Sequence, residues 1–220
     1  ELAVPSLNVT QSATSSQQVF SIRGIGTSGF NAGLEPSVGV FIDGVYRSRA
    51  ASAIDDFIAV ERVEVLRGPQ STVFGKNTPA GVISVVTKKP EQEFGFDIEQ
   101  TFGNYDSQIT RGTITGPIND MVSYRVSGNY NERDGFLDNV QPGEGDVNDR
   151  DRYALRGQLL IEPTDELSIR IIADGSSITE TCCGAPFFFN LPANQAALES
   201  IGATILPADI YERDIKFDGI

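Results

Sequence analysis

The stretch from residue 60 to residue 89 constrains the fold of this chain more than any other segment. Its first seven residues are rich in β-branched side chains, which predicts a strand. Gly68-Pro69 ends that strand, because proline has no N–H group to donate to a sheet. A short helical turn and a glycine break follow, and from Gly81 a nearly all-apolar run at 82–86 predicts a second strand, buried on both faces.

The formal net charge of −13 is divided unevenly along the 220 residues. Residues 1–90 contain 8 Lys/Arg and 7 Asp/Glu, a net charge of +1, whereas residues 91–220 contain 9 and 23, a net charge of −14. The asymmetry predicts two regions with different surroundings. An acidic half argues against nucleic acid as a partner, because phosphate binding needs a basic face. We interpret the acidic side chains as solvated loops rather than a cation site.

The chain has no histidine, and its two cysteines are adjacent, Cys182 and Cys183. A metal-ligand cluster and a Cys/His catalytic pair are therefore unavailable, and no nucleophile–base set is identifiable, so we predict no enzyme, no metal and no cofactor. Adjacent cysteines can close only a vicinal disulfide, pair with cysteines outside the chain, or remain free thiols. These alternatives stay open.

Two further observations limit the assignment. Residues 24–29 formally match the glycine pattern of dinucleotide-binding sites, but Gly33 and Pro36 prevent the helix that such a site needs, so we expect an exposed loop. The chain has no run of about 18 apolar residues and opens without a signal-peptide pattern. We expect it to begin partway through a longer or processed protein.

After residue 90 the pattern changes from apolar runs to alternation of apolar and polar side chains. Period-two alternation predicts strands at 94–102, 122–131, 153–162 and 167–174, whereas 108–115 is ambiguous. Strands of about ten residues with one apolar face are what a transmembrane β-barrel wall needs, with lipid outside and a wet interior. An antiparallel sheet of a soluble sandwich, with one buried face, is the alternative.

Connection lengths favour the barrel. Tight turns are expected at 116–120 and 163–166, and long loops at about 132–151 and 176–220, an alternation typical of outer-membrane proteins. The short connection at 103–107 is an exception. Helices are expected at 52–58 and, within the last loop, at 193–201.

Three motifs occur in order along the chain: Ile22-Arg23-Gly24, then Val40-Phe41-Ile42-Asp43-Gly44-Val45-Tyr46, then Glu61-Arg62-Val63-Glu64 with Leu66-Arg67-Gly68-Pro69-Gln70-Ser71. Together they resemble the plug domain of TonB-dependent outer-membrane receptors. The resemblance implies an α+β plug at 1–90, a small mixed sheet with short helices. It implies that 91–220 begin an antiparallel transmembrane barrel of roughly 22 strands. On this view the chain is a fragment.

The resemblance implies an active importer of a scarce nutrient such as a ferric siderophore, cobalamin or a glycan, in the bacterial outer membrane. The ligand would bind between the plug and the external loops. The TonB energy-coupling complex of the inner membrane would pair by strand addition with a segment absent here and pull on the plug. The other partner is the lipid bilayer.

The resemblance also implies roles for individual residues. Plug arginines of the family pair with carboxylates on the barrel wall, which carries to Arg23 and Arg67, with partners beyond this chain. The alternative is that both arginines close strand ends at a solvated surface. Substrate contacts carry to loop residues, here Phe30, Asn31, Tyr46 and Arg47.

A hypothesis from another class remains beside the importer. A soluble or surface-attached β-rich interaction module, glycan-binding or adhesin-like, would also show alternating strands and acidic loops. It predicts extraction without detergent and a chain that folds alone at this length.

Overall fold

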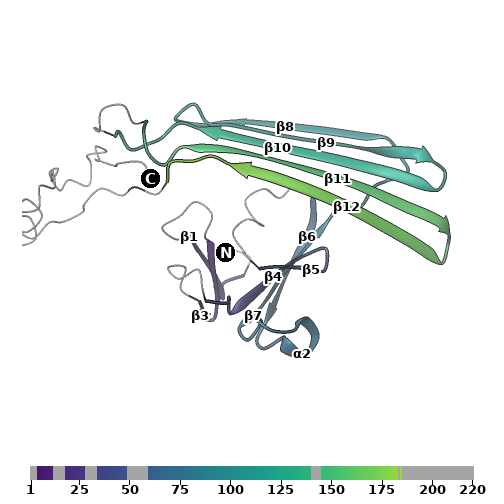
Figure 1. Ribbon diagram of the computed structural model, residues 1–220, viewed down its shortest axis with the longest axis horizontal. Coiled ribbons are helices and arrows are strands. Elements are labelled where there is room, and N and C mark those ends of the chain that lie inside the picture. The colour runs from purple at the N-terminus through teal and green to yellow at the C-terminus, as the bar shows by residue number, and fades with distance from the viewer. Residues whose placement is uncertain are drawn as a thin grey trace, which may run out of the picture. The chain divides into compact units, whose positions relative to one another are not determined.

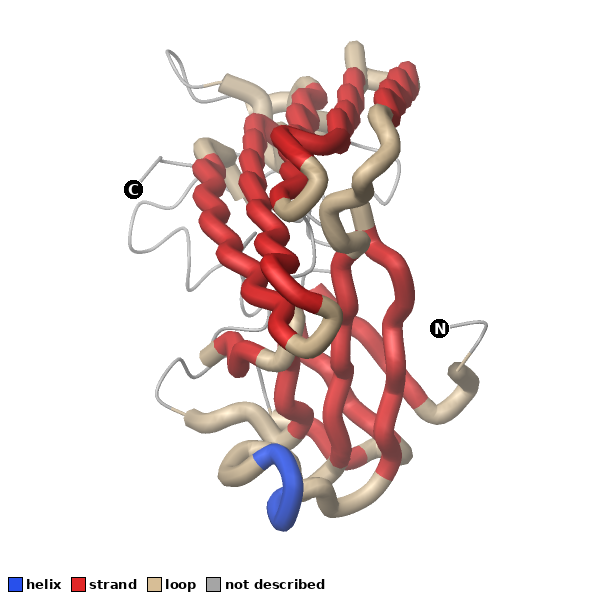
Figure 2. Tube along the Cα trace, turned by 90° about the vertical axis from the view of Figure 1, so that its right-hand side faces the viewer, coloured by secondary structure: helices blue, strands red, loops and turns tan. Residues whose placement is uncertain are grey.

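The computed structural model describes residues 4–11, 18–27, 34–48, 59–139, 145–182 and 184. This part of the chain is almost entirely β-structure, arranged in three sheets with one four-residue helix (Figures 1 and 2). The helices expected at 52–58 and 193–201 lie outside the described residues. Within the described residues, no helix has the length and apolar character needed to cross a membrane.

The first sheet is antiparallel and has the strand order β1-β2-β3. Its strands are β1 (Leu7–Gln11), β2 (Gln18–Ile22) and β3 (Ile25–Gly26). Arg23 and Gly24 form the turn between β2 and β3, and both have positive φ, 54° and 77°. The Ile-Arg-Gly motif is therefore the end of a strand and the start of a tight turn.

The second sheet is mixed and has the strand order β5-β4-β7-β6. Its strands are β4 (Val38–Ile42), β5 (Val45–Arg47), β6 (Val60–Arg67) and β7 (Gly81–Thr87). β4 and β7 are parallel, and the other two pairs are antiparallel. The helix α2 (Ser71–Phe74) lies in the connection from β6 to β7, so the strand, short helix and strand predicted for 60–89 are confirmed.

The first two sheets share one hydrophobic core. All five residues of β4 are buried, as are Gly81, Val82, Ile83, Val85 and Thr87 of β7. The core cluster comprises Phe20, Ile22, Val38, Val40, Ile42, Ala80, Ile83 and Val85. Fully burying a valine or isoleucine side chain contributes about 1.5–3 kcal/mol, so the core holds the mixed sheet together from within.

The third sheet is a meander with the strand order β12-β11-β10-β9-β8. Its strands are β8 (Gly95–Phe102), β9 (Gln108–Asn119), β10 (Val122–Arg133), β11 (Arg150–Thr164) and β12 (Leu167–Ile178). The four strands predicted from alternation are confirmed, and the ambiguous segment is also a strand. In β10 the buried residues are all polar, Ser123, Arg125, Ser127, Asn129 and Asn131, whereas large apolar side chains such as Val126 and Tyr130 are exposed.

The tight turn expected at 116–120 is wrong in position. β9 continues through Gly116-Pro117 to Asn119, because the fixed φ of proline is compatible with an extended strand. The turn consists of Asp120 and Met121, and the Asn119 side chain closes it by accepting a hydrogen bond from the Met121 N–H at 2.9 Å. The turn after β11 is likewise shorter than predicted, only Asp165-Glu166.

The chain divides into two compact units. The first comprises residues 1–100, 110–130 and 153–177, and the second comprises 101–109, 131–152 and 178–220. The first unit contains both small sheets and most of the meander, and all contacts of the site below lie within it.

Candidate functional site

Asp43 occupies the turn between β4 and β5, where Asp-Gly predicts a tight turn. Asp43 and Gly44 both have positive φ, 49° and 80°, a conformation that aspartate tolerates better than most residues. The Asp43 N–H donates to the Val85 carbonyl at 2.9 Å, which ties the turn to β7. The turn therefore directs the Asp43 carboxylate from the end of β4 toward the end of β7.

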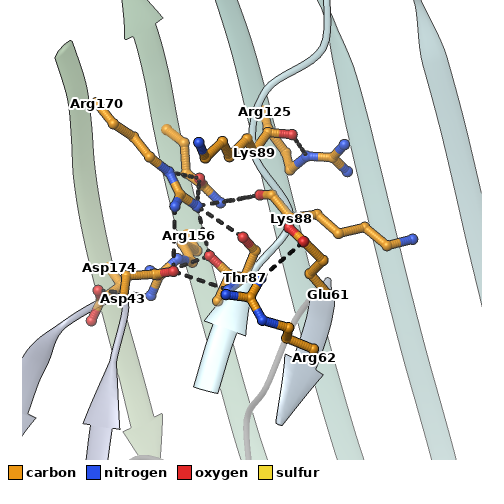
Figure 3. A network of polar contacts seen from close by, with 11 residues as sticks. Asp43, Glu61, Arg62, Thr87, Lys88, Lys89, Arg125, Arg156, Arg170 and Asp174 are labelled. Atoms are coloured by element: carbon orange, nitrogen blue, oxygen red, sulfur yellow. Dashed lines mark hydrogen bonds and ion pairs between the residues drawn. The ribbon is translucent and has the colours of Figure 1, made fainter. Parts of the chain in front are cut away.

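The Asp43 carboxylate accepts four hydrogen bonds and is 6% exposed (Figure 3). Two come from Thr87, from its N–H at 2.9 Å and its hydroxyl at 2.8 Å. The other two come from Arg156 and, at 3.3 Å, from Arg170. Two carboxylate oxygens have about four lone-pair positions, so the acceptor capacity of Asp43 is filled. We call Asp43, Thr87, Arg156 and Arg170 the Asp43 contact.

The two arginines of the Asp43 contact come from neighbouring strands of the meander, Arg156 from β11 and Arg170 from β12. Both belong to the polar face of their strand, and their side chains are 10% and 17% exposed. Arg170 also donates to the Thr87 hydroxyl at 2.8 Å and to the Thr87 carbonyl at 3.2 Å. Hydrogen bonds to charged groups contribute about 1.5–3 kcal/mol each, so the contact joins the mixed sheet to the meander.

A second group of contacts holds the segment that follows β7. Arg125 of β10 donates to the Lys89 carbonyl at 2.9 Å (Figure 3), and it also donates to the Glu91 carboxylate at 2.7 Å. Gln158 of β11 donates to the Lys88 carbonyl at 3.3 Å. Two side chains of the meander therefore fix the backbone where the chain passes from the mixed sheet to β8.

The predicted substrate residues that the structure describes are both engaged in contacts. The Arg47 guanidinium lies 3.4 Å from the carboxylate of Asp174 on β12, with side chains 33% and 39% exposed. The Tyr46 ring packs against Phe41 with centroids 5.4 Å apart, and its hydroxyl accepts from the Asn77 amide at 3.1 Å. Phe30 and Asn31 lie outside the described residues, so the substrate roles of all four remain predictions.

The arginines expected to hold the plug, Arg23 and Arg67, are exposed at the ends of β2 and β6. The Arg23 N–H donates to the Ser6 carbonyl at 2.8 Å. Neither side chain forms an ion pair within the described part of the chain, and their partners were expected outside it. Their role therefore stays a prediction. The Asp43 contact has the opposite polarity, with the carboxylate on the mixed sheet and the arginines on the meander, whereas the Arg47–Asp174 pair has the expected polarity.

Sequence reasoning missed Asp43, Arg125, Arg156, Arg170 and Asp174. Arg125, Arg156 and Arg170 fall on the polar faces of predicted strands, and an inward arginine among small polar residues needs an acceptor. That signal identifies the donors. The acceptor is not readable locally, because Asp43 and Arg170 are 127 residues apart in the sequence.

The second unit has its own polar contacts. Arg152 and Glu180 form an ion pair whose side chains are 1% and 2% exposed. The Asp149 carboxylate accepts from the Thr181 N–H, and burial raises the pKa of Asp149. Cys182 is disulfide-bonded. Cys183 lies outside the described residues, so the vicinal pairing remains a prediction.

Comparison with known proteins identifies the first part of the chain. Residues 2–82 match the family model described as the TonB-dependent Receptor Plug Domain. The chain is 34% identical over 94 residues to the iron-regulated outer membrane virulence protein of Vibrio cholerae, covering 40% of this chain and 14% of that protein. It is 31% identical over 121 residues to the pesticin receptor of Yersinia pestis, covering 55% of this chain and 18% of that protein.

Solved structures extend the similarity into the meander. The ferric yersiniabactin uptake receptor FyuA of Yersinia pestis has a TM-score of 0.71 and 27% identity, over 78% of this chain and 27% of that chain. The pyoverdine receptor FpvA of Pseudomonas aeruginosa, at 20% identity and a TM-score of 0.61, shares the fold. The chain thus spans less than a third of the length of these relatives.

The two small sheets with their common core, followed by a meander with one polar and one apolar face, define a plug domain joined to strands of a barrel wall. Residues 2–82 therefore match a plug domain of TonB-dependent receptors, and the fold of the chain is similar to that of the solved receptor FyuA. The pesticin and ferric yersiniabactin proteins that it resembles are named as receptors.

Proposed function

We propose that this chain is part of an energy-coupled outer-membrane receptor that imports a ferric siderophore. Residues 1–90 are the plug, and 91–220 begin an antiparallel barrel of roughly 22 strands. The relatives that favour a siderophore are receptors named for ferric yersiniabactin and ferrioxamine B.

The observation that carries the proposal is the polar character of the contact between the mixed sheet and the meander. The apolar core lies inside the two small sheets, whereas Asp43, Thr87 and the Lys88 and Lys89 carbonyls meet the meander through hydrogen bonds and ion pairs. Polar bonds can be exchanged for bonds to water, whereas an apolar core cannot. A plug held in this way can be displaced without losing its own core.

In this proposal the TonB complex pairs with a segment outside the chain and pulls on the plug. Arg23 and Arg67 hold the plug to wall strands that this chain does not include. Phe30, Asn31, Tyr46 and Arg47 contribute to ligand binding between the plug and the external loops at about 132–151 and 176–220. Lipid contacts the apolar face of the wall.

Uptake of radioactive iron tests the proposal. A strain lacking the gene, and the same strain carrying the full-length receptor, are supplied with ferric hydroxamate, ferric catecholate and ferric phenolate siderophores, with labelled cobalamin as the comparison. We expect receptor-dependent accumulation of at least one ferric siderophore, lost when the energy-coupling complex is absent. Accumulation of none of the three by the receptor-bearing strain would contradict the proposal.

A further inference from the structure

The guanidinium of Arg156 lies between two carboxylates that belong to different parts of the molecule. One terminal nitrogen donates to Asp43 on the β4–β5 turn. The other donates to Asp174 at 3.2 Å, and Asp174 lies on β12, the strand next to Arg156 in the meander. Arg156 therefore has one acceptor on the plug and one on the wall at the same time (Figure 3).

Arg170 repeats this arrangement. It donates to Asp43 and Thr87 on the plug side. Its Nε also donates at 3.0 Å to the side-chain carbonyl of Gln158, which lies on β11 of the wall. Each arginine of the Asp43 contact thus keeps an acceptor within the wall, independent of the plug.

The carboxylate side is built in the same way. Asp43 accepts two of its four hydrogen bonds from Thr87, a residue of its own sheet. If the turn moves away from the wall, Asp43 retains Thr87, Arg156 retains Asp174, and Arg170 retains Gln158. The large penalty for leaving one member of a shielded ion pair alone does not arise on either side.

We propose that Asp174 and Gln158 are positioning residues that make the Asp43 contact reversible. They hold the guanidinium groups of Arg156 and Arg170 in the orientation that Asp43 binds. The plug turn can then leave and return without the arginines forming other contacts in the meantime. The inference rests on the proposed function, in which the plug is displaced during import, and it specifies how the displacement is reset.

One other contact of Asp174 has to be separated from this role. Asp174 also pairs with Arg47 of β5, but that pair is 3.4 Å long and both side chains are about one-third exposed. Pairs of this kind contribute little. The substitution Arg47→Gln removes this pair and leaves the Arg156–Asp174 pair intact, so it is the matched control for Asp174→Asn.

The test measures how fast the Asp43 contact forms again after it has been broken, which we call relatching. The full-length receptor is held in a lipid bilayer, and force is applied through a tag at the N-terminal end of the plug. Asp43→Asn identifies the rupture event of the Asp43 contact, because that event weakens in this variant. The force is then released, and the waiting time needed before the event reappears is recorded. Immobilising one arginine in advance should accelerate relatching, so Asp174→Asn is expected to slow it about two- to tenfold.

Asp174→Glu, which keeps a carboxylate, should restore the wild-type relatching time, and Arg47→Gln should not change it. Gln158→Ala should slow relatching through Arg170, and it replaces Asp174→Asn if that variant does not assemble. Wild-type relatching in both Asp174→Asn and Gln158→Ala would overturn the inference. So would equal slowing in Arg47→Gln and Asp174→Asn, or an Asp43→Asn variant with unchanged rupture forces.

The measurement needs no transported ligand. A receptor that accumulates no ferric siderophore refutes the proposed function alone, whereas the relatching times bear on Asp174 and Gln158 alone.

Discussion

At the scale of single residues, Asp43 combines a backbone conformation with positive φ and a carboxylate whose hydrogen-bond acceptor positions are all occupied. Its φ of 49° suits aspartate and asparagine, and the carboxylate serves two arginines together. Asp43→Asn keeps the turn but removes the negative charge that Asp43 places beside the guanidinium groups of Arg156 and Arg170. We expect a loss of about 1.5–3 kcal/mol in unfolding free energy, because Arg156 keeps Asp174, Arg170 keeps Gln158, and only hydrogen bonds to the lost charge are weakened. Urea unfolding of the full-length receptor measures it. Glu61→Gln, which breaks an exposed pair with Arg62 at 3.1 Å, is the control and should cost under about 1 kcal/mol.

The exposed pair of Glu35 and Lys76 should make a contribution to stability that depends on pH. Its pKa is lowered, first by the hydrogen bond from Lys76 at 2.7 Å and then by the charge of Lys76. A lowered folded-state pKa contributes stability above the unfolded-state pKa, and this contribution is lost as the pH falls through the folded-state value. Glu35→Gln should therefore be slightly less stable than the wild type at pH 7, with the difference vanishing in acid. The effect is small, because the pair is exposed. Urea midpoints of both proteins at neutral and acidic pH measure the difference. A difference that grows in acid would contradict the prediction.

At the scale of elements, the β6–β7 pair depends on glycine where β7 begins. A Cβ on Gly81 would collide with the Leu66 carbonyl oxygen and would lie 2.6 Å from the Ile22 side chain, and the φ of Gly81 is 155°. Gly81→Ala must shift the backbone, so we expect a loss of about 1–3 kcal/mol. Gly157→Ala on β11 meets nothing within 4 Å and should be nearly neutral. Equal urea midpoints for the two variants would show that β7 adjusts freely.

The elements were predictable where their signals are local. Gly68-Pro69 marks the end of β6, and alternation identifies β8, β10, β11 and β12. The end of β9 was not predictable, because Gly-Pro is compatible with both a turn and an extended strand. The side-chain hydrogen bond of Asn119 that fixes the turn depends on the folded backbone. The Asp43 contact was beyond prediction from one sequence for a related reason. Its donors follow the strand period, but its acceptor comes from a sheet more than 100 residues away.

At the scale of the whole molecule, the apolar face of the meander should not tolerate a charged side chain. Leu155 on β11 is 59% exposed, on the apolar face that we propose contacts lipid. Leu155→Arg should destabilise the receptor by about 2–4 kcal/mol if the residue lies near the bilayer midplane. The control is Ser127→Ala on the opposite, polar face, where no lipid is expected. Unfolding in lipid vesicles measures both, and an unaffected Leu155→Arg variant would argue against a lipid-facing wall.

In the import cycle that we propose, the seven residues 88–94 between β7 and β8 limit how far the plug can move from the wall. A chain of that length reaches about 25 Å at most when fully extended, and Arg125 and Gln158 hold its first residues to the wall. A displaced plug would therefore remain covalently joined to the barrel by a short linker. Its return is a first-order event at an effective concentration that short linkers place in the millimolar range. The number of receptors in the membrane therefore does not affect how fast each one closes.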